Sequence, residues 1–98
     1  MKATFHLAQR FLERVLKKEN YTEEELYKIY FYLKQVCSTI IPRNYKGYCV
    51  LPDNSNFVIA YTENTATTIL PKEFVKDDLL YFGGKLSKKE YKKLKNRY

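Results

Sequence analysis

The only histidine of the chain, His6, is followed at intervals of four residues by Arg10 and Arg14. In an α-helix this spacing places the three side chains on one stripe, since each is rotated by only about 40° from the one before. An imidazole can take or give a proton near neutral pH, and two guanidinium groups can grip one phosphate. The pattern therefore points to phosphodiester cleavage. The alternative is a solvated helix face, because the stripe lies nearly opposite the apolar face of the same helix.

The charge of the chain favours a polyanionic partner, because 18 Lys and Arg against 11 Asp and Glu leave a formal net charge of +7. Much of the excess lies in residues 72–98, where a capping-box pattern at Ser87 and Glu90 precedes a predicted helix from Lys88 to about Arg97. We interpret this basic arm as a contact to backbone phosphate, and a solubilising tail is the alternative. The expected nucleic-acid-binding residues are Lys17, Lys85, Lys88, Lys89, Lys92, Lys93, Lys95 and Arg97.

Length and composition set the class of protein. A chain of 98 residues, 45% hydrophobic and 30% charged, has room for one packed domain and is unlike disordered or low-complexity sequences. We expect a core in residues 1–71 and a basic extension in residues 72–98. No apolar run is long enough for a membrane span, so we expect no membrane partner and a cytoplasmic location. Two cysteines, Cys37 and Cys49, and one histidine are too few for an ordinary zinc site, so we expect free thiols, no metal and no cofactor.

The sequence predicts two helices, and the stripe of His6, Arg10 and Arg14 lies on the first of them. Apolar residues recur at helical spacing over residues 3–18 and again from Leu26 to Cys37. Thr22 and Glu25 form a capping box at the start of the second helix. This helix should end near Ser38, because a β-branched run and then a proline follow it.

The middle of the chain predicts strands. Residues 45–51, 57–62 and 65–70 are rich in aromatic and β-branched side chains, and short connections between them force antiparallel pairing. Residues 72–82 have only a weak amphipathic pattern. The predicted fold is α+β, with two N-terminal helices packed on one face of an antiparallel β-meander and a basic C-terminal helix. The meander has three strands, or four if residues 40–44 join an edge.

The helix segment HLAQRFLER (residues 6–14), a second helix and a meander whose last strand reads TTILP (residues 67–71) together resemble small ribonuclease toxins. These toxins form the barnase, EndoU, colicin and RelE-like superfamily of bacteria and phages, in which such a helix often accompanies a T-V-[YI]-P-type strand. The resemblance covers about residues 5 to 71. The chain departs from the family pattern at Glu63 and Asn64, where relatives often carry an Asp-Gly pair.

The resemblance implies a toxin-type endoribonuclease that works without metal: a base takes the ribose 2'-OH proton, the 2'-oxygen attacks phosphorus, and cations hold the charge that accumulates on phosphate. It makes His6 the general base or acid, Arg10 and Arg14 the phosphate clamp, Thr68 a hydroxyl donor and Tyr61 an added hydroxyl. Ordinary strand composition is the alternative for Thr68. The implied partners are RNA and an acidic protein inhibitor, an antitoxin or immunity protein, that covers the basic cleft.

A second class of function stays open, a non-catalytic basic module that binds nucleic acid or acts as a phage-type regulator or inhibitor. The position of His6 separates the two classes. An enzyme needs His6 in a cleft where both arginines and a strand hydroxyl converge, whereas an isolated and exposed His6 favours the module.

Overall fold

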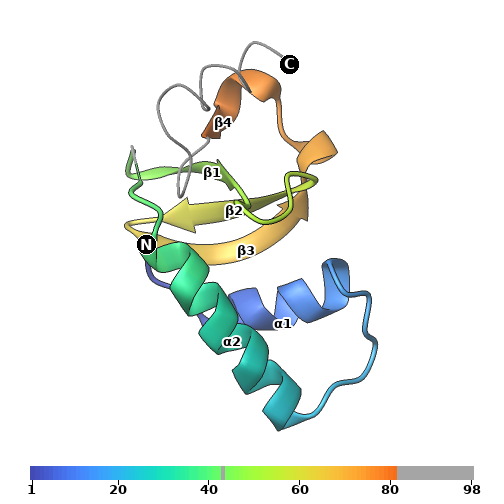
Figure 1. The fold of residues 1–98 in the computed structure, drawn as a ribbon. Coiled ribbons are helices and arrows are strands. Elements are labelled where there is room, and N and C mark those ends of the chain that lie inside the picture. The colour runs from blue at the N-terminus through green and yellow to red at the C-terminus, as the bar shows by residue number, and fades with distance from the viewer. Residues whose placement is uncertain (43, 82–98) are drawn as a thin grey trace.

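The computed structural model describes residues 1–42 and 44–81, and within them the chain forms two α-helices, a four-stranded sheet and two single-turn 3-10 helices. Figure 1 shows the two helices on the same side of the sheet. The predicted α+β class, with two N-terminal helices against a sheet, is confirmed.

The first helix, α1 (Phe5–Arg14), is shorter than the periodic stretch predicted for it. Thr4 caps its N-terminus, because the hydroxyl of Thr4 accepts a hydrogen bond of 3.1 Å from the backbone N–H of Leu7. Beyond the other end Lys17 adopts a φ of 54°, in the left-handed region that helices cannot continue through. The chain therefore leaves the helix one turn earlier than its apolar pattern suggests.

The second helix, α2 (Glu23–Ser38), begins and ends as predicted. The Thr22 hydroxyl accepts from the Glu25 backbone N–H at 3.2 Å, and the Glu25 carboxylate accepts from the Thr22 backbone N–H at 3.4 Å. This reciprocal pair satisfies two of the backbone donors that every helix leaves unpaired at its N-terminus.

Three antiparallel strands follow within one residue of their predicted bounds: β1 (Lys46–Val50), β2 (Phe57–Thr62) and β3 (Thr65–Pro71). The turn between β2 and β3 consists of Glu63 and Asn64, whose φ angles are 52° and 65°. Two successive positive φ values characterise the type I′ hairpin, whose twist matches that of the strands it joins.

The fourth strand corrects the predicted topology. It is β4 (Leu80–Tyr81) rather than residues 40–44, and it pairs with β1 in parallel, so the sheet is mixed with the order β3-β2-β1-β4. After β3, the 3-10 helices η1 (Lys72–Phe74) and η2 (Asp77–Leu79) carry the chain back across the sheet. It therefore reaches the free edge of β1 running in the same direction as β1, which an uninterrupted meander could not do.

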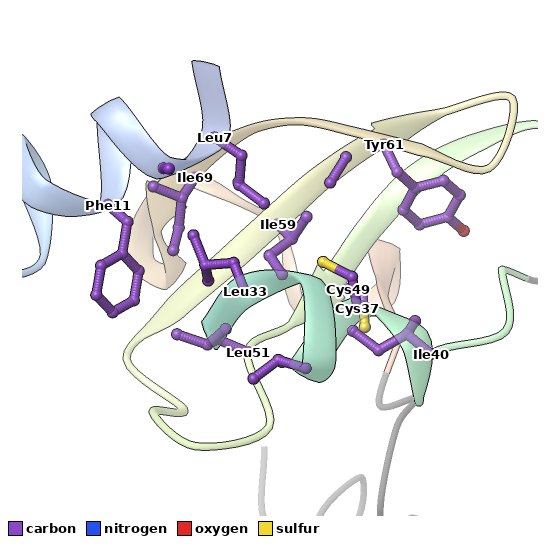
Figure 2. Close-up of a cluster of buried hydrophobic side chains, with 13 residues drawn as sticks. Leu7, Phe11, Leu33, Cys37, Ile40, Cys49, Leu51, Ile59, Tyr61 and Ile69 are labelled. Carbon is purple, nitrogen blue, oxygen red and sulfur yellow. The ribbon is translucent and has the colours of Figure 1, made fainter. Parts of the chain in front are cut away.

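Apolar side chains pack on both faces of the sheet. The larger cluster lies between the helices and the sheet and includes Leu7, Leu33, Ile59 and Ile69, as Figure 2 shows. A smaller cluster on the opposite face joins Val50 and Val58 of the strands to side chains after β3. Its other buried members are Val75 and Leu80, so packing continues past Pro71 to the end of the described chain.

Two remaining predictions concern the chain ends and membranes. The basic helix expected from residue 88 to about residue 97 lies outside the described residues. In residues 1–42 and 44–81, neither helix has the length and apolar character needed to cross a membrane.

Candidate functional site

Arg14 and Thr68, which belong to one site in the sequence analysis, are in contact in the structure. Arg14 lies in the last turn of α1, and its Nη1 donates to the backbone carbonyl of Ile69 at 2.6 Å and to the Thr68 hydroxyl at 3.2 Å. The two residues are 54 positions apart in the chain. The guanidinium is thus fixed in place by β3 rather than being free to swing in solvent.

These bonds also protect an edge of the sheet. β3 is an outer strand, and its first half pairs with the N-terminal segment through bonds from Lys2 N–H to the Asn64 carbonyl and from Ala66 N–H to the Lys2 carbonyl, each 2.8 Å. The Thr4 hydroxyl donates to the Ala66 carbonyl at 3.0 Å. Arg14 covers the second half of the same edge. Unpaired edge groups invite other strands to add, so Arg14 has a structural role whatever else it does.

A hollow of about 500 Å³ opens beside the Arg14 guanidinium. Its walls come from the end of α1, the start of β2 and the end of β3, which are near one another because Phe57 is paired with Pro71. The hydrogen bond from the Lys72 N–H to the Asn56 carbonyl, 2.8 Å long, joins two of these walls. The lining residues are Arg14, Lys17, Asn56, Phe57, Pro71, Lys72 and Glu73.

Electrostatically the hollow is cationic, because three basic side chains face one carboxylate there. Lys17 is one of the three, and its positive φ is a strained conformation for a residue with a Cβ. Many helices end on a residue in this conformation, so the end of α1 accounts for the backbone of Lys17. A cradle of this kind suits an anionic oxygen group such as phosphate.

The structure does not bring His6 and Arg10 into this hollow. His6 is exposed in the first turn of α1, and eight residues of helix separate it from Arg14 by about 12 Å along the axis. Arg10, on the turn between them, makes an ion pair of 2.8 Å with Glu13 at the surface. The stripe of His6, Arg10 and Arg14 therefore splits, because only Arg14 lines the hollow, where it is joined by Lys17.

Tyr61 lies elsewhere too. Its side chain is 2% exposed and packs between the sheet and the helices, where Figure 2 shows it at one end of the cluster. It occupies the space left by Gly47, since a Cβ on Gly47 would lie 2.7 Å from the Tyr61 hydroxyl oxygen. The predicted contacts of the basic tail, Lys85, Lys88, Lys89, Lys92, Lys93, Lys95 and Arg97, are outside the described residues.

The lining of the hollow includes residues that the sequence analysis missed, namely Asn56, Phe57, Lys72 and Glu73. A signal for them existed. Counting back from the two-residue turn places Phe57 opposite Leu70, and a β-bulge between Ala60 and Tyr61 moves its partner by one residue to Pro71, which is followed by Lys72. The hairpin register alone would thus have put Phe57 and Lys72 at the same end of the sheet as Thr68.

The two cysteines belong to the core. Neither cysteine forms a disulfide and both are fully buried, and burial raises the pKa of Cys37 to about 11. A thiol with so high a pKa is protonated at neutral pH and is a poor nucleophile. In the described part of the chain, no group of three His, Cys, Asp or Glu side chains could hold a metal ion.

No protein-family model, curated protein or solved structure matches this chain. The resemblance to ribonuclease toxins therefore rests on the residue patterns alone.

Proposed function

We propose that the protein is a basic module that binds RNA by its phosphate backbone, with the cationic hollow at the end of α1 as the principal contact. One observation carries the proposal: Arg14 is held by two hydrogen bonds to β3 while it faces a hollow that Lys17 and Lys72 also line. Only Nη1 of Arg14 is used in these bonds, and among the described residues its other guanidinium nitrogens have no hydrogen-bond partner. They supply the donors for a phosphate.

Preorganisation makes this arrangement effective. An arginine that is already immobilised loses little side-chain entropy on binding, and that cost would otherwise reduce affinity. The net charge of +7 adds long-range attraction, which raises the rate of encounter with a polyanion.

Binding is better supported than cleavage because of where His6 lies. The side chain that would move a proton at neutral pH is exposed at the far end of α1, and no hydrogen bond connects it to the described part of the chain. The residues that would hold phosphate and the residue that would act on the ribose do not converge in this structure.

Lys17→Gly is the variant that tests the hollow most cleanly. Glycine tolerates the left-handed backbone of position 17, so we expect the fold to be as stable as the wild type or more so while one cation is lost. Binding of a labelled RNA, followed by fluorescence anisotropy over a range of salt concentrations, should weaken. The slope of log K against log salt should fall by about 0.7, the value of one contact to a single strand.

Lys46→Ala is the matched control, because it removes the same charge at the opposite end of the sheet. Lys46 is exposed and pairs with Thr62, whereas the hollow lies at the Phe57 end of β2. The slope of log K against log salt for RNA binding by this variant should equal that of the wild type. Equal losses in the two variants would mean that the net charge alone attracts RNA, and this would contradict the proposal.

A second candidate function, metal-independent RNA cleavage, is favoured by the contact between Arg14 and Thr68, the pair that the ribonuclease resemblance assigns to one site. It requires His6 to act on RNA bound along α1. Incubation with RNA in EDTA, with a substrate carrying 2'-deoxyribose as the control, tests it: products ending in 2',3'-cyclic phosphate would establish cleavage. An acidic protein inhibitor that competes with RNA for the hollow would belong to this candidate.

A further inference from the structure

The outer face of α2 is more apolar than an ordinary solvated helix surface. Tyr27 and Phe31 are 49% and 56% exposed, and they lie four residues apart, on the side of α2 away from the core residues Leu33 and Val36. Figure 1 shows α2 at the outside of the molecule, with the sheet and α1 on its inner side. Phe5 of α1, 42% exposed, widens the patch.

The rings of this patch are already ordered. Phe5 stacks on Tyr30 with ring centroids 4.1 Å apart, and it meets Tyr27 edge to face at 5.4 Å. Rigid, half-exposed aromatic side chains are characteristic of the centres of protein interfaces, since they bury much area for little loss of side-chain entropy.

Charges flank the aromatic pair in a self-complementary order. Glu24 precedes Tyr27 by three residues and Lys34 follows Phe31 by three, and both charged side chains are exposed. Glu24 also forms an exposed ion pair of 3.5 Å with Lys28 on its own helix, a weak contact that leaves its carboxylate accessible to a second partner. The midpoint between Tyr27 and Phe31 is also the midpoint between Glu24 and Lys34. A second α2 laid antiparallel about a two-fold axis level with residue 29 would thus set Tyr27 against Phe31, and Glu24 against Lys34, on both sides of the axis.

We propose that the outer face of α2, formed by Glu24, Tyr27, Phe31 and Lys34, is the interface of a symmetric antiparallel dimer of this chain. The two aromatic pairs form its centre, and the two ion pairs fix its direction, because a parallel arrangement would set like charges together. A contact of two helices is near the small end of specific interfaces, so the dimer should dissociate in about the micromolar range. This inference does not depend on RNA binding, because none of these residues lines the hollow.

Charge exchange tests both the partner and the direction. We expect sedimentation equilibrium of the wild type to show a reversible monomer–dimer equilibrium. E24K sets Lys against Lys twice per dimer and K34E sets Glu against Glu twice, so each should weaken dimerisation about tenfold. The double variant E24K/K34E should regain the wild-type affinity, and an equimolar mixture of the two single variants should form heterodimers in preference to homodimers.

Glu23→Lys is the matched control, because in the proposed register position 23 faces the uncharged Gln35 of the second copy. It should leave the dissociation constant within about twofold of the wild type. Phe31→Ala should abolish dimerisation over the measured range, and circular dichroism should show an unchanged fold because the ring is exposed. A wild type that remains monomeric at millimolar concentration, or a double variant that fails to regain affinity, would overturn the proposal.

Discussion

The two ends of α1 differ in what lies opposite them. At the last turn, Arg14 reaches the edge strand β3, with Lys17 and Lys72 around the adjoining hollow. At the first turn, His6 faces solvent. Both ends carry members of one evenly spaced stripe, and β3 contacts both ends of the helix, through Thr4 before the first turn and through Arg14 in the last turn. The difference is that Arg14 turns toward the strand, whereas His6 is exposed. Helical spacing shows which side chains share a face, but the element packed against each turn decides what those side chains can do.

The largest difference between the two ends should appear on removal of Arg14. Arg14→Ala deletes two hydrogen bonds from a charged donor and uncovers part of the β3 edge, so we expect a loss of about 2 kcal/mol in the free energy of unfolding. Urea denaturation measures this loss. Arg10→Ala, whose partner Glu13 is at the surface, should cost less than about 1 kcal/mol. If the two variants lost equal stability, the contact of Arg14 with β3 would contribute no more to the free energy of unfolding than a surface ion pair does.

Alkaline pH should act on both ends alike, because the two groups whose pKa the fold raises most are on α2. Burial raises the pKa of Cys37 to about 11, and burial together with a hydrogen bond to Asp53 raises the pKa of Tyr32 to about 12. Both groups titrate at lower pH in the unfolded chain, so the stability they contribute is complete below about pH 9 and is lost as pH rises through 11 to 12. Denaturation at pH 7, 9 and 10.5 should give parallel losses in the wild type, Arg14→Ala and His6→Ala. A steeper loss in either variant would show that the substitution had disturbed α2.

A smaller effect should follow from Thr68→Val, which keeps the β-branched shape and removes the hydroxyl that Arg14 contacts at 3.2 Å. We expect a loss of about 1 kcal/mol in the wild-type background and almost none when Arg14 is already alanine. A double-mutant cycle in urea gives the coupling between the two side chains. Independent losses that simply add would mean that the contact contributes no stability of its own.

The smallest effect on stability should come from His6→Ala, which removes an exposed side chain from the first turn of α1 and should change the free energy of unfolding by less than about 0.5 kcal/mol. RNA affinity should be unchanged. The same variant decides the second candidate function: if the wild type cleaves RNA, loss of a proton-transfer group should slow cleavage by about 10²- to 10⁴-fold. Cleavage at the wild-type rate would remove His6 from any mechanism.

Local chemistry made much of the fold predictable. The capping box of Thr22 and Glu25 marks the start of α2, and the two-residue turn at Glu63 and Asn64 joins β2 to β3 as antiparallel neighbours. Both signals act between neighbours in the chain, so they can be recognised without tertiary information. The shared site of Arg14 and Thr68 depended on the family resemblance, because no local rule links residues 54 positions apart.

The structure differs from the expectations, or separates the expected site residues, where tertiary contacts decide. β4 has only two residues, Leu80 and Tyr81, which is too short for any periodic signal, and it forms because the free edge of β1 is available to it. The position of Tyr61 near a strand end suggests an accessible hydroxyl. Its ring is instead buried in the core, where it fills the space left by the missing side chain of Gly47. His6 lies apart from Arg14 and Thr68 because it is exposed at the first turn of α1, and a helical wheel contains no information about which turn has a side chain in contact with the neighbouring strand.

The hydrogen bonds that fasten α1 to β3 have a consequence for the order of folding. The bond from Thr4 to Ala66 spans 62 residues, and the bond from Arg14 to Ile69 spans 55. Bringing together residues so far apart in the chain costs loop-closure entropy before any favourable contact forms. We therefore expect slower folding than in a helical protein of the same length. During synthesis both helices leave the ribosome before β3 does, so α1 can pack on α2 early, but the part of its apolar side that contacts β3 stays uncovered until the third strand has been made.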